Sequence, residues 1–337
     1  MSDALLNTLA EALAELVTVV ETSDEDTLDP DTAVKWLEST AHLLGRLPAA
    51  DRRTLDGLFR DAALRQPPGP WREELGRVSE GLGLTRGAHE RYCDEVEDHV
   101  RRFVATVRDA DPATLVPTCP GWTLADLVRH HGTSHRWMDH LVRTKATARV
   151  RSGDVELDLP DAPEAYPAWL ERSAAAALET LRAADPDAPM WSLGPDPHVR
   201  FFPRRLLHEA VVHLADAELA LGLTPRVEPA TAADGIDEFL ENLPYVAWVA
   251  EPVAQLDLDG ARLRLSALDT GVTWTLAFGG GGFTWQRRAE GPASTTVEAS
   301  TGDLLLLLYG RVPADDPRYT LTGDLALLDD WCAATAF

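Results

Sequence analysis

The chain is strongly acidic, which excludes two classes of partner. Its 337 residues contain 55 Asp and Glu against 31 Lys and Arg, giving a formal net charge of −24 at pH 7. Nucleic acids and anionic membrane surfaces bind basic patches, so neither is expected as a partner. Apolar runs such as Leu304–Leu308 are far shorter than the ~20 residues that span a bilayer. The length allows two or three domains.

Cysteine usage and the N-terminus indicate a cytoplasmic protein. Cys93, Cys119 and Cys332 are widely spaced, form no CxxC pair and are odd in number, which speaks against a disulfide framework. The first residues include Asp3 and Glu11 and lack the basic segment of a signal peptide. Together these features predict a reducing, cytoplasmic environment.

Residues 1–85 are predicted to form a small all-helical unit. Apolar residues recur with helical spacing in 4–21 and 30–44, and a third helix is expected from Asp51. A short helix should follow, and residues 81–87 should form a linker. Nothing in this unit predicts chemistry, so contact with a protein partner is the role left open for it.

Residues 86–243 are predicted to form a four-helix bundle. Its long amphipathic helices should begin near Ala88, Thr123, Tyr166 and Arg204. The tetrapeptide Thr123–Asp126 has the pattern of a capping box, which would fix the start of the second helix. Bundles of this kind commonly hold metal sites between facing helices.

Residues 244–337 are predicted to form a small α+β domain. Apolar residues alternate with polar ones at Leu263 and Leu265, the period of a half-buried strand. The run Gly279–Gly282 fits a hairpin turn better than a phosphate-binding loop, because no helix follows it and no Lys is nearby. Helices are expected after Thr301 and from Leu325.

The fourth bundle helix carries the residues that predict chemistry. Glu209 and His213 lie one turn apart on the same face, on a stripe of otherwise small or apolar side chains. A carboxylate and an imidazole on an inward face are costly to bury unless a group neutralises them, and a divalent metal would do so. A further ligand should come from the second helix, where helical periodicity does not choose between His130 and His131.

Residues from about 88 to 337 resemble the mycothiol-dependent maleylpyruvate isomerase family of actinobacteria. Four stretches carry the resemblance in the same order and with the same spacing. They are Thr118–Val128 with His130 and His135–Trp137, His208–Glu209 with His213 and Asp216–Glu218, Ala233–Phe239, and Leu304–Arg311 with Thr322–Asp324. The helical unit before residue 85 is extra to this family, and His131 replaces an apolar residue expected there.

The resemblance implies a fold and a site. The fold is mainly α with α+β: a DinB-like four-helix bundle followed by a small sterol-carrier-like domain. The site is a zinc centre of His-Glu-His type, carried onto His130, Glu209 and His213, so that the resemblance selects His130. It also implies mycothiol as thiol cosubstrate and a catalytically important C-terminal arginine, for which Arg311 is the candidate.

The implied chemistry depends on the metal positions that three protein ligands leave open. A thiol that binds there loses its proton and becomes a strong nucleophile. Addition to a cis-enedioate, rotation and elimination would isomerise the double bond. Displacement of a leaving group would instead transfer the sulfur. The expected function is therefore a mycothiol-using isomerase or S-transferase acting on a small electrophile. His and carboxylate ligands also suit nickel, iron or manganese.

Alternative functions remain open from the sequence. A thiol-independent metalloenzyme or hydrolase could use the same bundle, because fold does not fix function. A non-enzymatic regulatory or binding protein could act through residues 1–85. The three ligand candidates could also be a buried, hydrogen-bonded polar cluster without metal.

Several neighbouring side chains also have two interpretations. His135 and Asp216 could orient metal ligands or form a surface pair. Arg204 and Arg205 could bind substrate carboxylates, but pairing with the chain's abundant acids is favoured. Cys119 is expected to be a packed small residue rather than a nucleophile.

Overall fold

The computed structural model describes residues 3–24, 27–45, 47, 49–67, 69–84, 88–256, 258–289 and 291–335. The chain divides into two compact units, Met1–Ala88 and His89–Phe337. The linker expected at residues 81–87 falls partly on 85–87, which lie outside the described residues. Among the helices described, none combines the length and apolar character needed to cross a membrane.

The first unit consists of helices that pack on a small apolar core. They are α1 (Asp3–Thr22), α2 (Pro30–Gly45), α3 (Ala49–Arg65) and α4 (Pro70–Gly81). Ala14, Phe59 and Val78 lie at the centre of this core and are almost completely buried. The opposite face of α1 exposes Leu9, Leu16 and Val19 to solvent. The protein partner expected for this unit stays a prediction.

The second unit begins with the predicted four-helix bundle. Its helices are α5 (Ala88–Val107), α6 (Leu124–Thr144), α7 (Tyr166–Ala183) and α8 (Phe201–Ala220). The capping box is confirmed: the Thr123 hydroxyl accepts from the backbone N–H of Asp126, and the Asp126 carboxylate accepts from that of Thr123. Helix α8 begins three residues before the expected Arg204, because Pro203 is tolerated in a first turn.

Close packing joins α6 to α7. Gly132 lies against the ring of Trp169, where a Cβ atom would come within 2.1 Å of the indole. Trp169 is fully buried and donates its ring N–H to the carbonyl of Leu157. Helix α5 completes the bundle through Phe103, whose ring contacts His131 of α6 edge-on. The absence of a side chain at residue 132 therefore sets how closely α6 and α7 approach.

The remaining part of the second unit is an α+β layer, which includes α9 although the predicted α+β domain begins at residue 244. Its helices are α9 (Pro229–Asn242), α10 (Ala247–Ala254), α11 (Thr301–Leu308) and α12 (Leu325–Ala334). Its strands are β1 (Arg262–Ala267), β2 (Thr273–Gly279), β3 (Gly282–Arg287), β4 (Thr295–Ala299) and β5 (Thr320–Gly323). A short 3₁₀ helix, Leu243–Tyr245, follows α9. Two others, Ser152–Asp154 and Pro163–Ala165, lie between α6 and α7 of the bundle. The fold is therefore mainly α with α+β, as predicted.

The five strands form one mixed sheet. Their order is β3-β2-β1-β4-β5, with β1 and β4 parallel and the other neighbours antiparallel. The glycine hairpin is confirmed: Phe278 pairs with Phe283, and Gly280 and Gly281 adopt φ values of 63° and 74°. Two successive positive φ values are those of a type I′ turn, which glycine adopts without strain.

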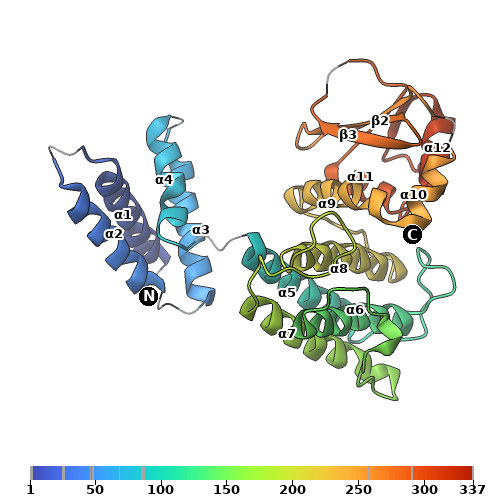
Figure 1. The fold of residues 1–337 in the computed structure, drawn as a ribbon, viewed down its shortest axis with the longest axis horizontal. Helices are drawn as coiled ribbons and strands as arrows, with labels where there is room; N and C mark the ends of the chain where they lie inside the picture. Colours follow the sequence, from blue (N-terminus) through green and yellow to red (C-terminus); the bar gives the residue numbers. More distant parts are fainter. Residues whose placement is uncertain are drawn as a thin grey trace. The chain divides into compact units, whose positions relative to one another are not determined.

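Helices α9 and α11 lie between the sheet and the bundle (Figure 1). Asp234 of α9 accepts hydrogen bonds from Arg204 and from Nε2 of His208, both on α8. Gly235 allows this contact, because a Cβ there would lie 2.9 Å from Nδ1 of His208. The α+β layer is thereby fixed against the helix that carries the candidate metal ligands.

We expect Gly132→Ala to destabilise the second unit by about 1–3 kcal/mol, because the added methyl group overpacks the α6–α7 contact with Trp169. Gly153→Ala is the matched control, since no heavy atom lies within 4 Å of a Cβ there. Urea unfolding followed by tryptophan fluorescence measures both. Equal stability of the two variants would contradict the packing argument.

Candidate metal centre and pocket

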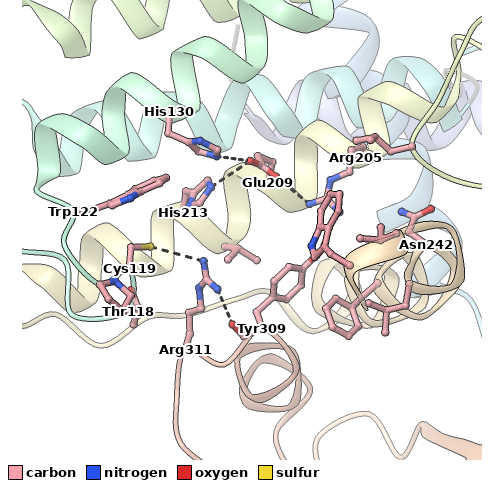
Figure 2. A pocket seen from close by; sticks show the side chains of 17 residues that line it. Thr118, Cys119, Trp122, His130, Arg205, Glu209, His213, Asn242, Tyr309 and Arg311 are labelled. Carbon is pink, nitrogen blue, oxygen red and sulfur yellow. Dashed lines mark hydrogen bonds and ion pairs between the residues drawn. The ribbon is translucent and has the colours of Figure 1, made fainter. Parts of the chain in front are cut away.

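Two helices bring a carboxylate and two imidazoles together. His130 of α6 places Nε2 3.0 Å from Oε1 of Glu209, and Nε2 of His213 lies 3.3 Å from the same oxygen. One ligand atom from each of the three residues lies within 4.8 Å of the other two. Figure 2 shows the three side chains pointing toward one another across the gap between α6 and α8.

The donor set and its spacing fit a divalent metal. Tetrahedral zinc with bonds of roughly 2.0–2.1 Å separates its ligand atoms by about 3.3 Å, close to the two distances here. Two imidazole nitrogens and one carboxylate oxygen are a common catalytic ligand set. These residues could therefore hold a metal with little movement.

Asp216 fixes the orientation of His213. Its Oδ2 lies 2.9 Å from Nδ1 of His213, which leaves Nε2 directed at Glu209. Burial alone would lower the pKa of His213, but hydrogen bonds with Asp216 and Glu209 raise it to about 9. The same carboxylate accepts from the hydroxyl of Thr118 and from two nitrogens of Arg311. Burial would raise the pKa of Asp216, but His213 and Arg311 hold it at about 2.

Arg205 holds the second oxygen of Glu209. Its Nη2 lies 3.3 Å from Oε2 of Glu209, while its Nη1 donates to both oxygens of Glu238 on α9. Burial would raise the pKa of Glu209, but His130, His213 and Arg205 together keep it well below the usual value. The carboxylate therefore stays ionised, with Oε1 turned toward the imidazoles.

Neighbouring histidines lie behind this cluster and not in it. His131 and His135 are fully buried, and their ring nitrogens have no hydrogen-bond partner in the described part of the chain. Burial lowers the pKa of His131 well below its usual value and that of His135 to about 4, so both rings are neutral. The structure thus brings His130, and not His131, to Glu209. The interpretation of His135 and Asp216 as a surface pair is wrong, because both are buried. Of the two, Asp216 contacts a candidate ligand, His213.

A cavity of about 460 Å³ opens beside the cluster. Its lining residues come from the turn before α6, from α6 and α8, from the loop between α7 and α8, and from two segments of the α+β domain. They are Thr118, Cys119, Pro120, Trp122, His130, Leu193, Arg205, Glu209, Val212, His213, Phe239, Asn242, Leu243, Val246, Trp248, Tyr309 and Arg311. In Figure 2, Arg311 and Tyr309 reach this pocket from the segment that follows α11.

The predicted site residue Arg311 lies in the pocket, but it is held by other groups. Its Nε and Nη2 lie 3.0 and 3.1 Å from the two oxygens of Asp216, and its Nη1 donates to the carbonyl of Tyr309. Its side chain is 6% exposed, so it is rigidly placed on the pocket wall. The favoured pairing of Arg204 and Arg205 with acids is confirmed.

Sequence reasoning missed several residues of the site. The contact of Arg205 with Glu209, four residues later, had a readable helical signal, whereas Asp216 was already considered as a residue that could orient a metal ligand. The sequence contains no such signal for Tyr309 or the segment 239–248, because their place in the pocket depends on how the α+β domain packs on α8.

Cys119 lines the pocket as a protonated thiol. Burial raises the pKa of the Cys119 thiol to about 11, and the carboxylate of Asp216, which lies 3.6 Å from the sulfur, is the second cause of this rise. At neutral pH only about one molecule in ten thousand then carries the thiolate, the reactive form. This agrees with the expected role as a packed small residue, and it implies that a nucleophilic sulfur would have to come from elsewhere.

Family models match the second unit along most of its length. The N-terminal domain of mycothiol maleylpyruvate isomerase matches residues 93–218, and the C-terminal domain described as MDMPI matches residues 230–330. The chain belongs to the mycothiol-dependent maleylpyruvate isomerase family. Neither match includes the first unit, so the helices α1–α4 are an addition to the two family domains.

Solved structures include similar chains. The mycothiol-dependent maleylpyruvate isomerase is 15% identical, with a TM-score of 0.47, over 69% of this chain and 92% of that one. A histidine-to-alanine variant of a mycothiol-dependent maleylpyruvate isomerase gives a TM-score of 0.48 at the same identity and coverage. No curated protein matches the sequence.

We expect alkylation of Cys119 by iodoacetamide to be slow at pH 7 and to accelerate about tenfold per pH unit up to its pKa near 11, because the reactive thiolate accumulates as pH rises. Mass spectrometry of the peptide that contains Cys119 measures the rate, with free glutathione as the reference thiol. Reaction at pH 7 as fast as that of glutathione would show that the thiol is activated instead.

Proposed function

We propose that this protein is a metal-dependent enzyme that uses mycothiol to isomerise a small electrophile or to transfer sulfur to it. Family membership supports thiol-dependent isomerase chemistry. The observation that carries the proposal is the convergence of His130, Glu209 and His213 on the wall of an open pocket. A structural metal would be closed off by a fourth protein ligand, whereas these three leave room for one from solution.

The proposed metal is Zn²⁺, held by Nε2 of His130, Oε1 of Glu209 and Nε2 of His213. When bound, it lowers the pKa of a coordinated thiol and so provides a thiolate at neutral pH. Asp216 keeps His213 in the tautomer that presents Nε2, and Arg205 keeps Oε1 of Glu209 turned inward. Such outer contacts typically change metal affinity by about 10–100-fold when removed.

Arg311 is proposed to bind an oxygen of the electrophile. A guanidinium has five N–H groups. Those of Arg311 reach Asp216, the carbonyl of Tyr309 and the sulfur of Cys119, and one N–H of Nη1 has no partner in the described part of the chain. Because Asp216 contacts both Arg311 and His213, the guanidinium is held at a fixed place relative to the proposed metal. A preorganised donor there stabilises negative charge that builds on a carbonyl oxygen as sulfur attacks.

We expect one equivalent of zinc per chain in protein purified without chelator, and a loss of metal affinity of more than about 100-fold in His130→Ala. Asp216→Asn should lower the metal affinity about 10–100-fold, because His213 is no longer held in one tautomer. His140→Ala is the control, a histidine on the same helix that lies outside the cluster. Elemental analysis and competition with a chromogenic chelator measure these changes. Stoichiometric metal retained by His130→Ala would refute the ligand set.

We expect consumption of a test electrophile such as diethyl maleate to require both the metal and mycothiol, because Cys119 is held as a thiol and the protein offers no thiolate of its own at this site. Product analysis distinguishes the two reactions: isomerisation to the trans diester regenerates the thiol, whereas stable addition of sulfur to one alkene carbon and of a proton to the other consumes it. Equal rates with and without mycothiol would favour a thiol-independent metalloenzyme.

A further inference from the structure

The pocket has two chemically different walls. The polar wall carries the metal-ligand cluster and Arg311. The apolar lining residues are Leu193, Val212, Phe239, Leu243, Val246 and Trp248, and those from 239 onward form the other wall. Four of these six come from one continuous segment, the end of α9 through the start of α10. Asn242, in this segment, and His130 lie on opposite sides of the pocket in Figure 2.

The charged side chains around the pocket nearly neutralise one another. Among the described residues that line the pocket, the arginines are Arg205 and Arg311, and no lysine lines it. Arg205 pairs with the carboxylate of Glu238, and Arg311 pairs with that of Asp216. With Glu209, three carboxylates face two guanidinium groups, a formal charge of −1 when His130 and His213 are neutral, as imidazoles that bind a metal are. A divalent metal brings the sum to +1, and a bound thiolate brings it to zero.

A small dicarboxylate would therefore enter a pocket with no spare positive charge. Its first negative group would find only guanidinium groups already neutralised by Glu238 and Asp216, and its second would lie against the apolar wall. Burying an unpaired carboxylate in such surroundings is strongly unfavourable. An uncharged molecule meets no such penalty, and an apolar body gains free energy by covering the wall formed by residues 239–248.

We propose that the electrophile of this enzyme is uncharged and has an apolar body, in contrast to a doubly charged cis-enedioate such as maleylpyruvate. The inference rests on the proposed function for the identity of the reaction, but the apolar wall and the charge balance define the ligand class by themselves. The body lies against Phe239, Leu243 and Val246, and a carbonyl or similar oxygen accepts from Arg311. The segment 239–248 is thus the specificity-determining part of the pocket.

Turnover with matched substrates tests the charge preference. Maleate and diethyl maleate share the reacting double bond, and they differ in charge and in apolar groups. For each, the rate with zinc-loaded full-length protein and mycothiol is divided by the rate of mycothiol alone, which removes the difference in intrinsic reactivity. The diester should show at least a tenfold larger acceleration. A larger acceleration for maleate would overturn the proposal.

Binding of an unreactive probe tests the apolar wall without the thiol. Dimethyl phthalate should bind the zinc-loaded protein saturably, and Val246→Asp should weaken its binding at least fivefold by placing a carboxylate on the wall. Tyr245→Asp is the matched control, because the neighbouring Tyr245 is 59% exposed and does not line the pocket. Zinc content, measured in both variants, should stay the same. Equal binding by the two variants, or no saturable binding by the parent protein, would overturn the proposal.

The two arms separate failure of this inference from failure of the proposed function. If the protein with mycothiol converts neither compound faster than mycothiol alone, but dimethyl phthalate binding depends on Val246, then the proposed thiol reaction is wrong and the proposed ligand class stands. If the protein with mycothiol accelerates conversion of maleate and not of the diester, the proposed thiol reaction stands and the proposed ligand class is wrong.

Discussion

The carboxylate of Asp216 connects the parts of the protein that its candidate site needs. It is completely buried, and it binds His213 on α8, Thr118 in the turn before α6 and Arg311 from the segment after α11. A buried charge of this kind persists only when its partners are all in place. The tautomer of a candidate metal ligand, the position of a loop and the position of the candidate catalytic arginine therefore depend on one side chain.

Local signals in the sequence were sufficient for most of the architecture. Helical and strand periodicities, the capping box at Thr123 and the glycine hairpin at Gly279–Gly282 each depend on residues close together in the chain, so their structures follow from the sequence directly. Helix α10 and strand β5 were not expected. The strand is only four residues long, and its formation depends on pairing with β4, which short-range patterns do not encode.

The candidate site was predictable only where its members share a helix or match a family pattern. Glu209 and His213 follow from helical spacing, whereas periodicity left His130 and His131 equivalent and only the family resemblance favoured His130. The structure separates them by environment: His130 faces Glu209 at the pocket, and His131 is buried against Phe103. Tyr309, Asn242 and Trp248 enter the site through packing of the α+β layer, a tertiary effect that no local pattern contains.

The position of Arg311 shows that the two layers of the second unit supply different parts of the pocket. Helices α6 and α8 alone supply the three metal-ligand candidates, whereas the guanidinium and most of the apolar wall arrive from residues after 238. Exchange of the later layer, with a partner for Asp216 kept, would leave the three candidate ligands in place while changing the rest of the pocket lining. Diversification within such an architecture can thus proceed by altering one layer, with the helices that carry the candidate ligands left untouched.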